Sequence, residues 1–267
     1  MQHRWKLTSG LVTAALVAAG SAAFAQEPER IGDEPNLNGV WQAMNTAYWN
    51  LEPHSAEPAP GDLAGLVGAI GAIPAGLGVV EGGQIPYLPE ALETRDANRA
   101  SAPAGDPEAK CYLPGIPRAT YMNLPFQIIQ GGGDMLFAYE YATANRVIEM
   151  DEPVVAPIDT WMGASNGSWD GDTLVVVTTA QNGMTWLDRA GNYLTPTATV
   201  TERFTLSGPD HIAYEATIED PAVYSEPWSI SMPLYRRTEP NAQILEFKCV
   251  PFAEDLLYGD LKPEDAE

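Results

Sequence analysis

Histidine and cysteine are scarce in this chain, and so are basic side chains. Its 267 residues include three histidines, two cysteines and 14 lysines and arginines, against 36 aspartates and glutamates, for a net charge of −22. Three histidines and two cysteines are a poor supply for a usual zinc site. So negative a chain disfavours nucleic acid and anionic membranes as partners, because both are bound chiefly through Lys and Arg. We therefore predict neither a metal site nor a nucleic-acid partner.

Nucleotide-binding motifs are also absent. The chain has no Walker sequence and no G-x-G-x-x-G that follows a strand, so nucleotide cofactors are disfavoured. The acidic turn WDGD at 169–172 could offer oxygen ligands to calcium, but the spacing of an EF-hand loop is missing. We predict a protein that works without a cofactor.

Residues 1–25 have the form of a secretory signal peptide. Two basic residues precede an uncharged run at 11–19, and AFA at 23–25 has the small-x-small form that a signal peptidase cuts. The run is too short to span a bilayer comfortably. We predict cleavage before Gln26 and a periplasmic or secreted protein that makes no stable membrane insertion.

The two cysteines are Cys111 and Cys249. Export would bring them to an oxidising compartment, where a pair usually forms a disulfide. Nothing around either residue suggests a metal or redox role. We predict a disulfide, and the alternative is two free buried thiols. Closing so long a loop would stabilise the fold by roughly 5 kcal/mol in the chain-entropy model.

Short β-like runs separated by turn residues predict a mainly β fold. The predicted strands are residues 37–45, 125–130, 135–142, 145–151, 172–179, 199–206, 211–220, 228–236 and 243–250. Strands at this spacing without intervening helices favour an antiparallel barrel or a sandwich over a βαβ fold.

The predicted organisation has four parts. Residues 1–25 are the leader, and 26–110 hold an N-terminal strand, Pro/Gly-rich loops and a short surface helix at 90–100, packed on the barrel. Residues 111–258 form the barrel core and 259–267 an acidic tail. The uncharged stretch 63–80 is rich in glycine, which argues against a membrane span. It is either a packed loop or a lid over a cavity.

Alternation along residues 200–206 places Glu202 on the apolar side of its strand, with Val200 and Phe204. A buried carboxylate without a partner is costly. We predict an ion pair with Arg236 or Arg203. The functional alternative is general acid or base work by Glu202 in the dry interior.

GASNG at 163–167 matches the G-x-S-x-G pattern of serine hydrolases. A functional motif places the serine between a strand and a helix, with an acid and a histidine downstream. Here a turn-like stretch and a β-run follow Ser165, and an arrangement of Ser165 with Asp188 and His211 has no local signature. We predict a hairpin entry in which Ser165 bonds to the backbone.

Aromatic and charged side chains gather in the predicted loops. Aromatic rings around a few polar groups suit a pocket for an apolar or ring-shaped ligand, and equally an ordinary core. The predicted ligand-binding residues are Trp161, Trp186, Arg189, Tyr214, Trp228 and Arg118, with an arginine holding any polar end. The predicted acid and base residues are Glu202, Asp188 and Asp159.

Long stretches at 111–130, 160–176, 185–191 and 214–228 carry a resemblance. They resemble a widespread family of exported bacterial proteins that shares the motifs TWMGxSxGxWxGDTLVV and TWLDRAG and has no assigned activity. The resemblance implies export and a common β-rich fold, and it transfers no catalytic residue. GVW at 39–41 is also similar to the G-x-W of the first lipocalin strand. An antiparallel calycin-like barrel is therefore the leading architecture, with a β-sandwich as the alternative.

Three functions remain open at this point. We expect an exported monomeric barrel that binds a small apolar or aromatic molecule. The alternative is a cofactor-free periplasmic lyase, isomerase or hydrolase that uses carboxylate acid and base catalysis. The third is a structural or interaction module of the cell envelope.

Overall fold

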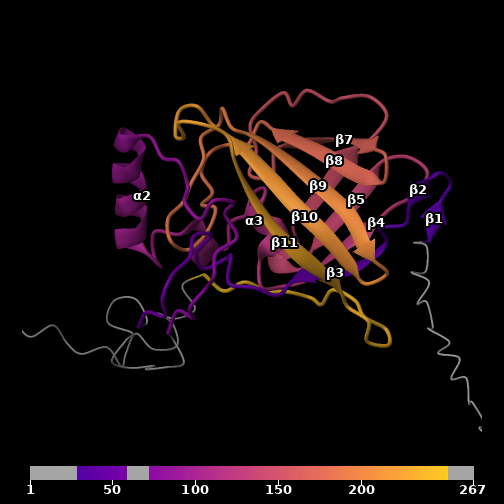
Figure 1. Cartoon of the computed structure of the whole chain (residues 1–267), viewed down its shortest axis with the longest axis horizontal. Helices are drawn as coiled ribbons and strands as arrows, with labels where there is room; N and C mark the ends of the chain where they lie inside the picture. Colours follow the sequence, from indigo (N-terminus) through magenta and orange to yellow (C-terminus); the bar gives the residue numbers. More distant parts are fainter. Residues whose placement is uncertain (1–28, 59–71, 252–267) are drawn as a thin grey trace, which may run out of the picture.

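A closed β-barrel forms the body of the protein (Figure 1). The computed structural model describes residues 29–58 and 72–251. Around the barrel the strand order is β10-β11-β3-β4-β5-β6-β7-β8-β9. The strands are β3 (Gly39–Ala43), β4 (Phe126–Ile129), β5 (Met135–Tyr139), β6 (Asn145–Glu149), β7 (Ala164–Asp170), β8 (Thr173–Thr179), β9 (Thr199–Gly208), β10 (His211–Glu219) and β11 (Trp228–Arg236). The predicted β-barrel is thus confirmed, and the sandwich is not.

Several predictions from the sequence lie outside the described residues. These are the leader 1–25 with its cleavage before Gln26, the acidic tail 259–267 and the first half of the uncharged stretch 63–80. The described end of that stretch forms isolated bridges, in which Ile73 pairs with Glu57 and Val80 pairs with Ile230 of β11. Residue 80 therefore lies against the barrel wall.

The barrel is mixed, because β6 and β7 run parallel while the other neighbouring strands run antiparallel. Ile148 pairs with Ser165 in the parallel register. Two parallel strands need a long crossover connection, and residues 150–163 supply it. The prediction of a wholly antiparallel barrel is corrected at this one pairing.

Strand β7 corrects the prediction of a turn at 166–172, of which only residues 171–172 form the turn. Its polar sequence ASNGSWD has low strand propensity, but pairing with β8 along its whole length overrides that preference. Gly167 fits this close packing, since a Cβ there would lie 2.4 Å from Met150 Sδ and 2.6 Å from Ile148 Cγ2. Gly163 has a φ of +69°, as the predicted hairpin entry requires, whereas Gly167 has no positive φ.

The prediction of a strand at 243–250 is wrong, because this segment forms no strand in the structure. Residues 242–250 carry no strand pairing, although their apolar residues alternate. A closed barrel has no free edge to which another strand could pair, because β11 already lies between β10 and β3. This segment instead runs along the outside of the barrel, and we call residues 239–250 the C-terminal arm.

Helix α3 (Arg118–Tyr121) packs against the barrel, whereas α2 (Pro89–Ser101) stands apart from the strands and contacts the loop at 191–193 (Figure 1). The surface helix α2 buries only Ala91 and confirms the helix predicted at 90–100. The short helix α3 is wholly buried. The remaining elements are η2 (Pro107–Lys110), η3 (Tyr141–Thr143) and a two-stranded ribbon of β1 (Arg30–Ile31) with β2 (Glu34–Pro35). Within the described ranges, no helix is long and apolar enough to cross a membrane.

The GVW stretch lies on β3 and packs against the end of β11. The Trp41 side chain is fully buried, and its Nε1 donates to the Leu37 carbonyl at 2.9 Å. The Arg236 guanidinium lies over its ring, 4.2 Å from the centroid. Gly39 makes room for this arginine, since a Cβ there would lie 2.2 Å from Arg236 Nη1.

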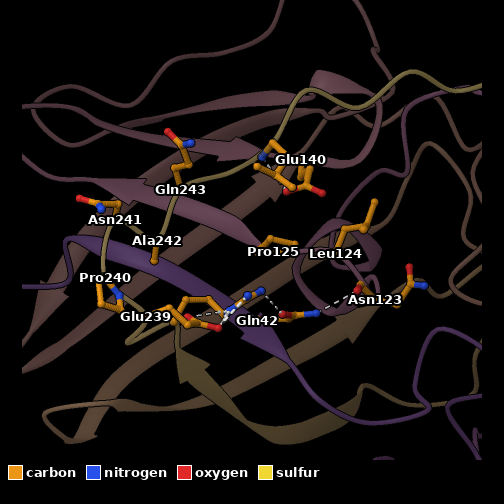
Figure 2. A pocket seen from close by; sticks show the side chains of 12 residues that line it. Gln42, Asn123, Leu124, Pro125, Glu140, Glu239, Pro240, Asn241, Ala242 and Gln243 are labelled. Carbon is orange, nitrogen blue, oxygen red and sulfur yellow. Dashed lines mark hydrogen bonds and ion pairs between the residues drawn. The ribbon is translucent and has the colours of Figure 1, made fainter.

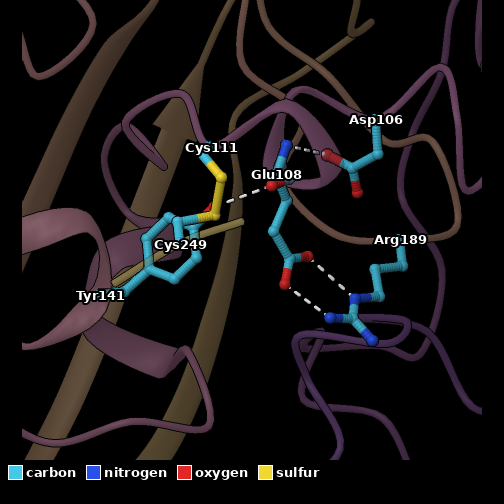
Figure 3. The surroundings of a disulfide bond; sticks show 6 residues. All are labelled: Asp106, Glu108, Cys111, Tyr141, Arg189 and Cys249. Atoms are coloured by element: carbon cyan, nitrogen blue, oxygen red, sulfur yellow. Dashed lines mark hydrogen bonds and ion pairs between the residues drawn. A yellow bond between two sulfur atoms is a disulfide. The ribbon is translucent and has the colours of Figure 1, made fainter. Parts of the chain in front are cut away.

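The predicted disulfide between Cys111 and Cys249 is present, and Figure 3 shows its surroundings. It joins the end of η2 to the C-terminal arm. Beside it, Tyr141 Oη donates to the Glu108 carbonyl at 2.9 Å. The bond therefore holds the arm against the part of the chain that carries η2 and η3.

Removing this disulfide should destabilise the fold. We expect the double variant Cys111→Ser/Cys249→Ser to lose about 2–5 kcal/mol of unfolding free energy, because the unfolded chain regains the entropy of a loop closed across 138 residues. Urea denaturation of the full chain measures the loss. The wild type under reducing conditions should match the variant, and an unchanged unfolding midpoint would contradict the prediction.

Candidate functional site

A group of polar side chains lies inside the barrel at the end where α3 packs. Arg146 near the start of β6 forms a salt bridge with Glu202 near the start of β9, and their side chains are 2% and 0% exposed. Glu202 Oε1 also accepts hydrogen bonds from Tyr214 Oη at 2.8 Å and from Thr120 Oγ1 of α3 at 3.2 Å. We call Arg146, Glu202, Thr120, Tyr139, Ser165, Thr178 and Tyr214 the Arg146 cluster.

Ser165, the serine of the G-x-S-x-G match, belongs to this cluster. Its Oγ accepts a hydrogen bond from Arg146 Nε at 2.7 Å and lies 3.0 Å from Thr178 Oγ1. Arg146 Nη2 donates to the same threonine at 2.7 Å. The predicted bond from Ser165 to the backbone is thus corrected to contacts with side chains. Its hydroxyl has no histidine partner among the described residues, whereas a serine nucleophile needs a general base.

The ion partner of Glu202 is neither of the two arginines predicted for it. Arg236 lies over Trp41, and Arg203 pairs at the surface with Asp170 at 2.8 Å. Arg146 was missed, although the same alternation that placed Glu202 inward places it on the inner face of β6. The burial pattern of β6 is strictly alternating there, with residues 146 and 148 buried.

Two donors of the Arg146 cluster are poorly paired. Arg146 Nη1 and Tyr139 Oη are buried, and neither makes a hydrogen bond of regular geometry with a described group, although Arg146 and Thr120 lie close enough to the Tyr139 hydroxyl for weaker polar contacts. Burial raises the pKa of the Tyr139 phenol, and the neighbouring charge of Arg146 offsets part of that rise. Leaving a buried donor unpaired costs about 1–3 kcal/mol. A hydrogen-bond acceptor placed between them would recover that cost.

Aromatic rings surround these donors. The Arg146 guanidinium lies 5.9 Å from the Phe137 ring centroid. Phe137 packs edge to face on Phe204 at 5.4 Å and stacks on Phe126 at 6.0 Å. The Tyr214 ring packs on Phe204, with ring centroids 5.0 Å apart. The cluster is therefore a small polar group within an aromatic interior.

Asp188 is buried in the loop that follows β8, outside the strands. Its two carboxylate oxygens accept hydrogen bonds from the backbone N–H groups of Leu51, Ala190 and Asn192 and from the Asn192 side chain, at 2.6–3.2 Å. Burial raises the pKa of Asp188 to about 6, and the hydrogen bonds oppose that rise. These contacts make Asp188 the organiser of the TWLDRAG loop at 185–191.

The two arginines predicted to bind ligand, Arg118 and Arg189, are both engaged by carboxylates. Arg118 donates to both oxygens of Asp106, at 2.9 and 2.8 Å, and to Glu108 at 2.7 Å. Arg189 donates to Glu108 at 2.8 Å, as Figure 3 shows, and lies over the Trp49 ring. Burial tends to raise the pKa of Glu108, but the Arg189 hydrogen bond and both arginine charges outweigh it and lower that pKa.

The predicted aromatic residues lie in separate places. Trp161 stacks on the half-exposed Tyr112, with ring centroids 4.8 Å apart. Trp186 is buried in the TWLDRAG loop. Trp228 at the start of β11 packs on Tyr224 at 5.3 Å, and its buried Nε1 has no acceptor among the described residues. The structure brings only Tyr214 of the predicted ligand set into the Arg146 cluster.

The predicted carboxylates are likewise divided. Glu202 lies in the Arg146 cluster and Asp188 in the TWLDRAG loop, and buried Tyr121 of α3 is close enough to both for their charges to raise the pKa of its phenol, after burial. Asp159 is exposed in the crossover loop. In the part of the chain that the structure describes, no three His, Cys, Asp or Glu side chains are placed to hold a metal.

Comparison with known proteins adds no family to this picture. No protein-family model matches the chain, and no curated protein matches it.

Breaking the Arg146–Glu202 pair should be costly, and replacing it should be less so. We expect Arg146→Met or Glu202→Leu alone to lose about 3–5 kcal/mol of unfolding free energy, because each leaves a buried charge unpaired. The double variant should lose less than either single variant. Arg203→Met, which breaks a surface pair, should lose at most about 1 kcal/mol. Urea denaturation tests this, and additive losses would contradict it.

Asp188 should make stability fall as the pH rises from about 4 to about 6. Its folded pKa is raised, so the folded state binds more protons than the unfolded state in this window. We expect a contribution of about 1–3 kcal/mol that is present below pH 4 and lost above pH 6. Asp188→Asn should flatten the pH profile of unfolding free energy, whereas the exposed Asp151→Asn should leave it unchanged. Equal profiles for wild type and Asp188→Asn would refute the assignment.

Proposed function

We propose that this protein binds a small apolar or aromatic molecule that carries a hydrogen-bond acceptor, such as a carboxylate, in the barrel interior. The observation that carries the proposal is a pair of neighbouring buried groups that lack hydrogen bonds of regular geometry, Arg146 Nη1 and Tyr139 Oη. A cationic donor and a phenol favour an anionic or carbonyl oxygen between them. Ligand sites typically combine a few such polar groups with an apolar lining.

The rings around the cluster support the apolar part of this ligand. Phe137 lies against the Arg146 guanidinium, Phe204 packs on Phe137, and Tyr214 extends the aromatic surface. Offset or edge-to-face contact with these rings would favour a flat ring over a flexible chain. In this proposal Arg146 binds the polar end of the ligand, which the sequence analysis predicted for Arg118 or Arg189. Those two arginines already face carboxylates of their own chain.

The end of the barrel near α3 is the proposed entrance. Thr120 and Tyr121 of α3 bond to Glu202 and to the Leu187 carbonyl respectively. A ligand entering here has to displace these contacts, so binding should be coupled to movement of α3. Trp186 and Trp228 lie in the TWLDRAG loop and at the start of β11, and in this proposal they line the path to the cluster, with Trp161 further out.

Export to an oxidising compartment is part of the proposal, as is action as a monomer. The Cys111–Cys249 disulfide supports export, because such bonds persist chiefly in secreted and periplasmic proteins. The enzyme alternative has weaker support. The oxygens of Glu202 and Asp188 are occupied by donors from the chain itself, and Asp159 lies at the surface.

Binding should depend on the acceptor group of the ligand. We expect 1-naphthoate to raise the unfolding temperature and to bind saturably, and 1-naphthylmethylammonium, which has the same rings but only donors, to bind at least tenfold more weakly. Tyr139→Phe should weaken naphthoate binding by about 2–10-fold, the value of one hydrogen bond. Isothermal titration calorimetry measures both effects.

The matched control is Tyr235→Phe, which removes a phenol from β11 away from the cluster and should leave binding unchanged. Native mass spectrometry of the purified protein, compared with its denatured mass, should also reveal any ligand that it retains. The proposal fails if both probes bind equally well, or if Tyr139→Phe has no effect on a naphthoate affinity that is otherwise measurable.

A further inference from the structure

A second site lies on the outside of the barrel, apart from the Arg146 cluster. Figure 2 shows a pocket between the segment 123–125, which precedes β4, and the C-terminal arm. Its volume is about 380 Å³. Gln42 of β3 and Glu140 after β5 complete its walls. This volume lies within the range of small-molecule sites, about 300–1,000 Å³.

The wall formed by the C-terminal arm is held in place at several points. The Leu245 backbone N–H donates to Glu140 Oε2 at 2.8 Å. Further along, the Phe247 ring packs on Tyr141, with centroids 5.3 Å apart, and Cys249 is bound to Cys111. The pocket is therefore bounded by a covalently attached segment and is preformed.

Glu140 is the carboxylate of this pocket that forms no salt bridge in the described part of the chain. It is 8% exposed, yet it has no cationic partner within the described ranges. Oε2 accepts the Leu245 N–H, whereas Oε1 has no hydrogen-bond donor there and is not among the fully buried unpaired atoms, so it is open to the pocket. Figure 2 places its side chain across the pocket from Gln42 and Glu239. A carboxylate buried to this degree normally has a paired cation.

The one arginine of the pocket balances that charge only at longer range. The Glu239 hydrogen bond, and to a smaller extent the charge of Glu140, raise the pKa of Arg237, but Arg237 makes no salt bridge with Glu140. Arg237 is bound by Glu239, with its Nε 2.9 and 3.1 Å from the two carboxylate oxygens, and its Nη1 donates to Gln42 Oε1 at 3.0 Å. Arg237 and Glu239 thus neutralise each other. The negative charge of Glu140 remains, on a chain whose net charge of −22 already attracts cations.

We propose that this pocket binds a small organic cation, with Glu140 receiving its primary ammonium group. An ammonium carries three donors and can bridge the free carboxylate oxygen and neighbouring amide oxygens. Asn123 and Gln243 supply such amides, and Leu124 and Pro125 offer apolar contact to a short carbon chain. The site is independent of the barrel interior, whose proposed ligand carries the opposite charge.

The test uses 1,4-diaminobutane as the cation and 1,4-butanediol as a neutral probe of the same length, each titrated into the full chain by calorimetry. We expect saturable binding of the diamine and binding of the diol at least tenfold weaker. Glu140→Gln should weaken diamine binding at least tenfold. Glu219→Gln, which removes the same charge at an exposed position on β10, should change it by less than twofold.

A second measurement uses only the wild-type protein, so it does not depend on whether a variant folds. In the wild type, the side-chain amide resonances of Gln42, Asn123 and Gln243 should shift on addition of the diamine and not of the diol. Absence of saturable diamine binding, equal binding of the diol, or shifts confined to other residues would each overturn the proposal. These outcomes leave the naphthoate test of the barrel interior unaffected.

Discussion

The buried ion pair between Arg146 and Glu202 is the interaction on which the rest of the barrel depends. Two charges in a dry interior are tolerated when further hydrogen bonds satisfy most of the oxygens and N–H groups nearby. Their partners come from β7, β8, β10 and α3. A slip of one residue in any of these strands would turn a cluster member to the outer face. The pair therefore specifies register as well as charge balance, and it leaves two donors facing inward.

The same physical rule shapes the loops outside the barrel. Asp188 satisfies backbone N–H groups that no strand or helix pairs, and such groups cannot be buried alone. Arg118, two residues before Thr120 on α3, donates hydrogen bonds to the carboxylates of Asp106 and Glu108. Helix α3 thus joins two polar networks, one inside the barrel and one beneath its loops. Movement of α3 would disturb both, which links the proposed entrance to the loops that carry Trp186 and Arg189.

Much of the barrel follows from a period of two in the sequence. Alternation correctly placed Glu202 among Val200 and Phe204, and it would have placed Arg146 inward as well. It failed to predict β7, because Asn166 and Gly167 are poor strand formers that only their neighbouring strands hold in place. It also predicted a strand in the C-terminal arm, where the closed barrel has no free edge for another strand to pair with. The convergence of Thr120 and Arg146 on Glu202 depends on tertiary structure, and so does a pocket walled by a segment that folds back.

The parallel pair of β6 and β7 follows from simple parity. In a ring where every strand runs opposite to both neighbours, directions alternate, so the number of strands must be even. This ring has nine strands, and at least one neighbouring pair must therefore point the same way. The long connection at 150–163 is the means by which the chain returns to the starting end. A hairpin turn could not replace this connection, because it joins only antiparallel strands. The exposed Val155 and Ile158 therefore lie on a segment that the odd number of strands requires to be long.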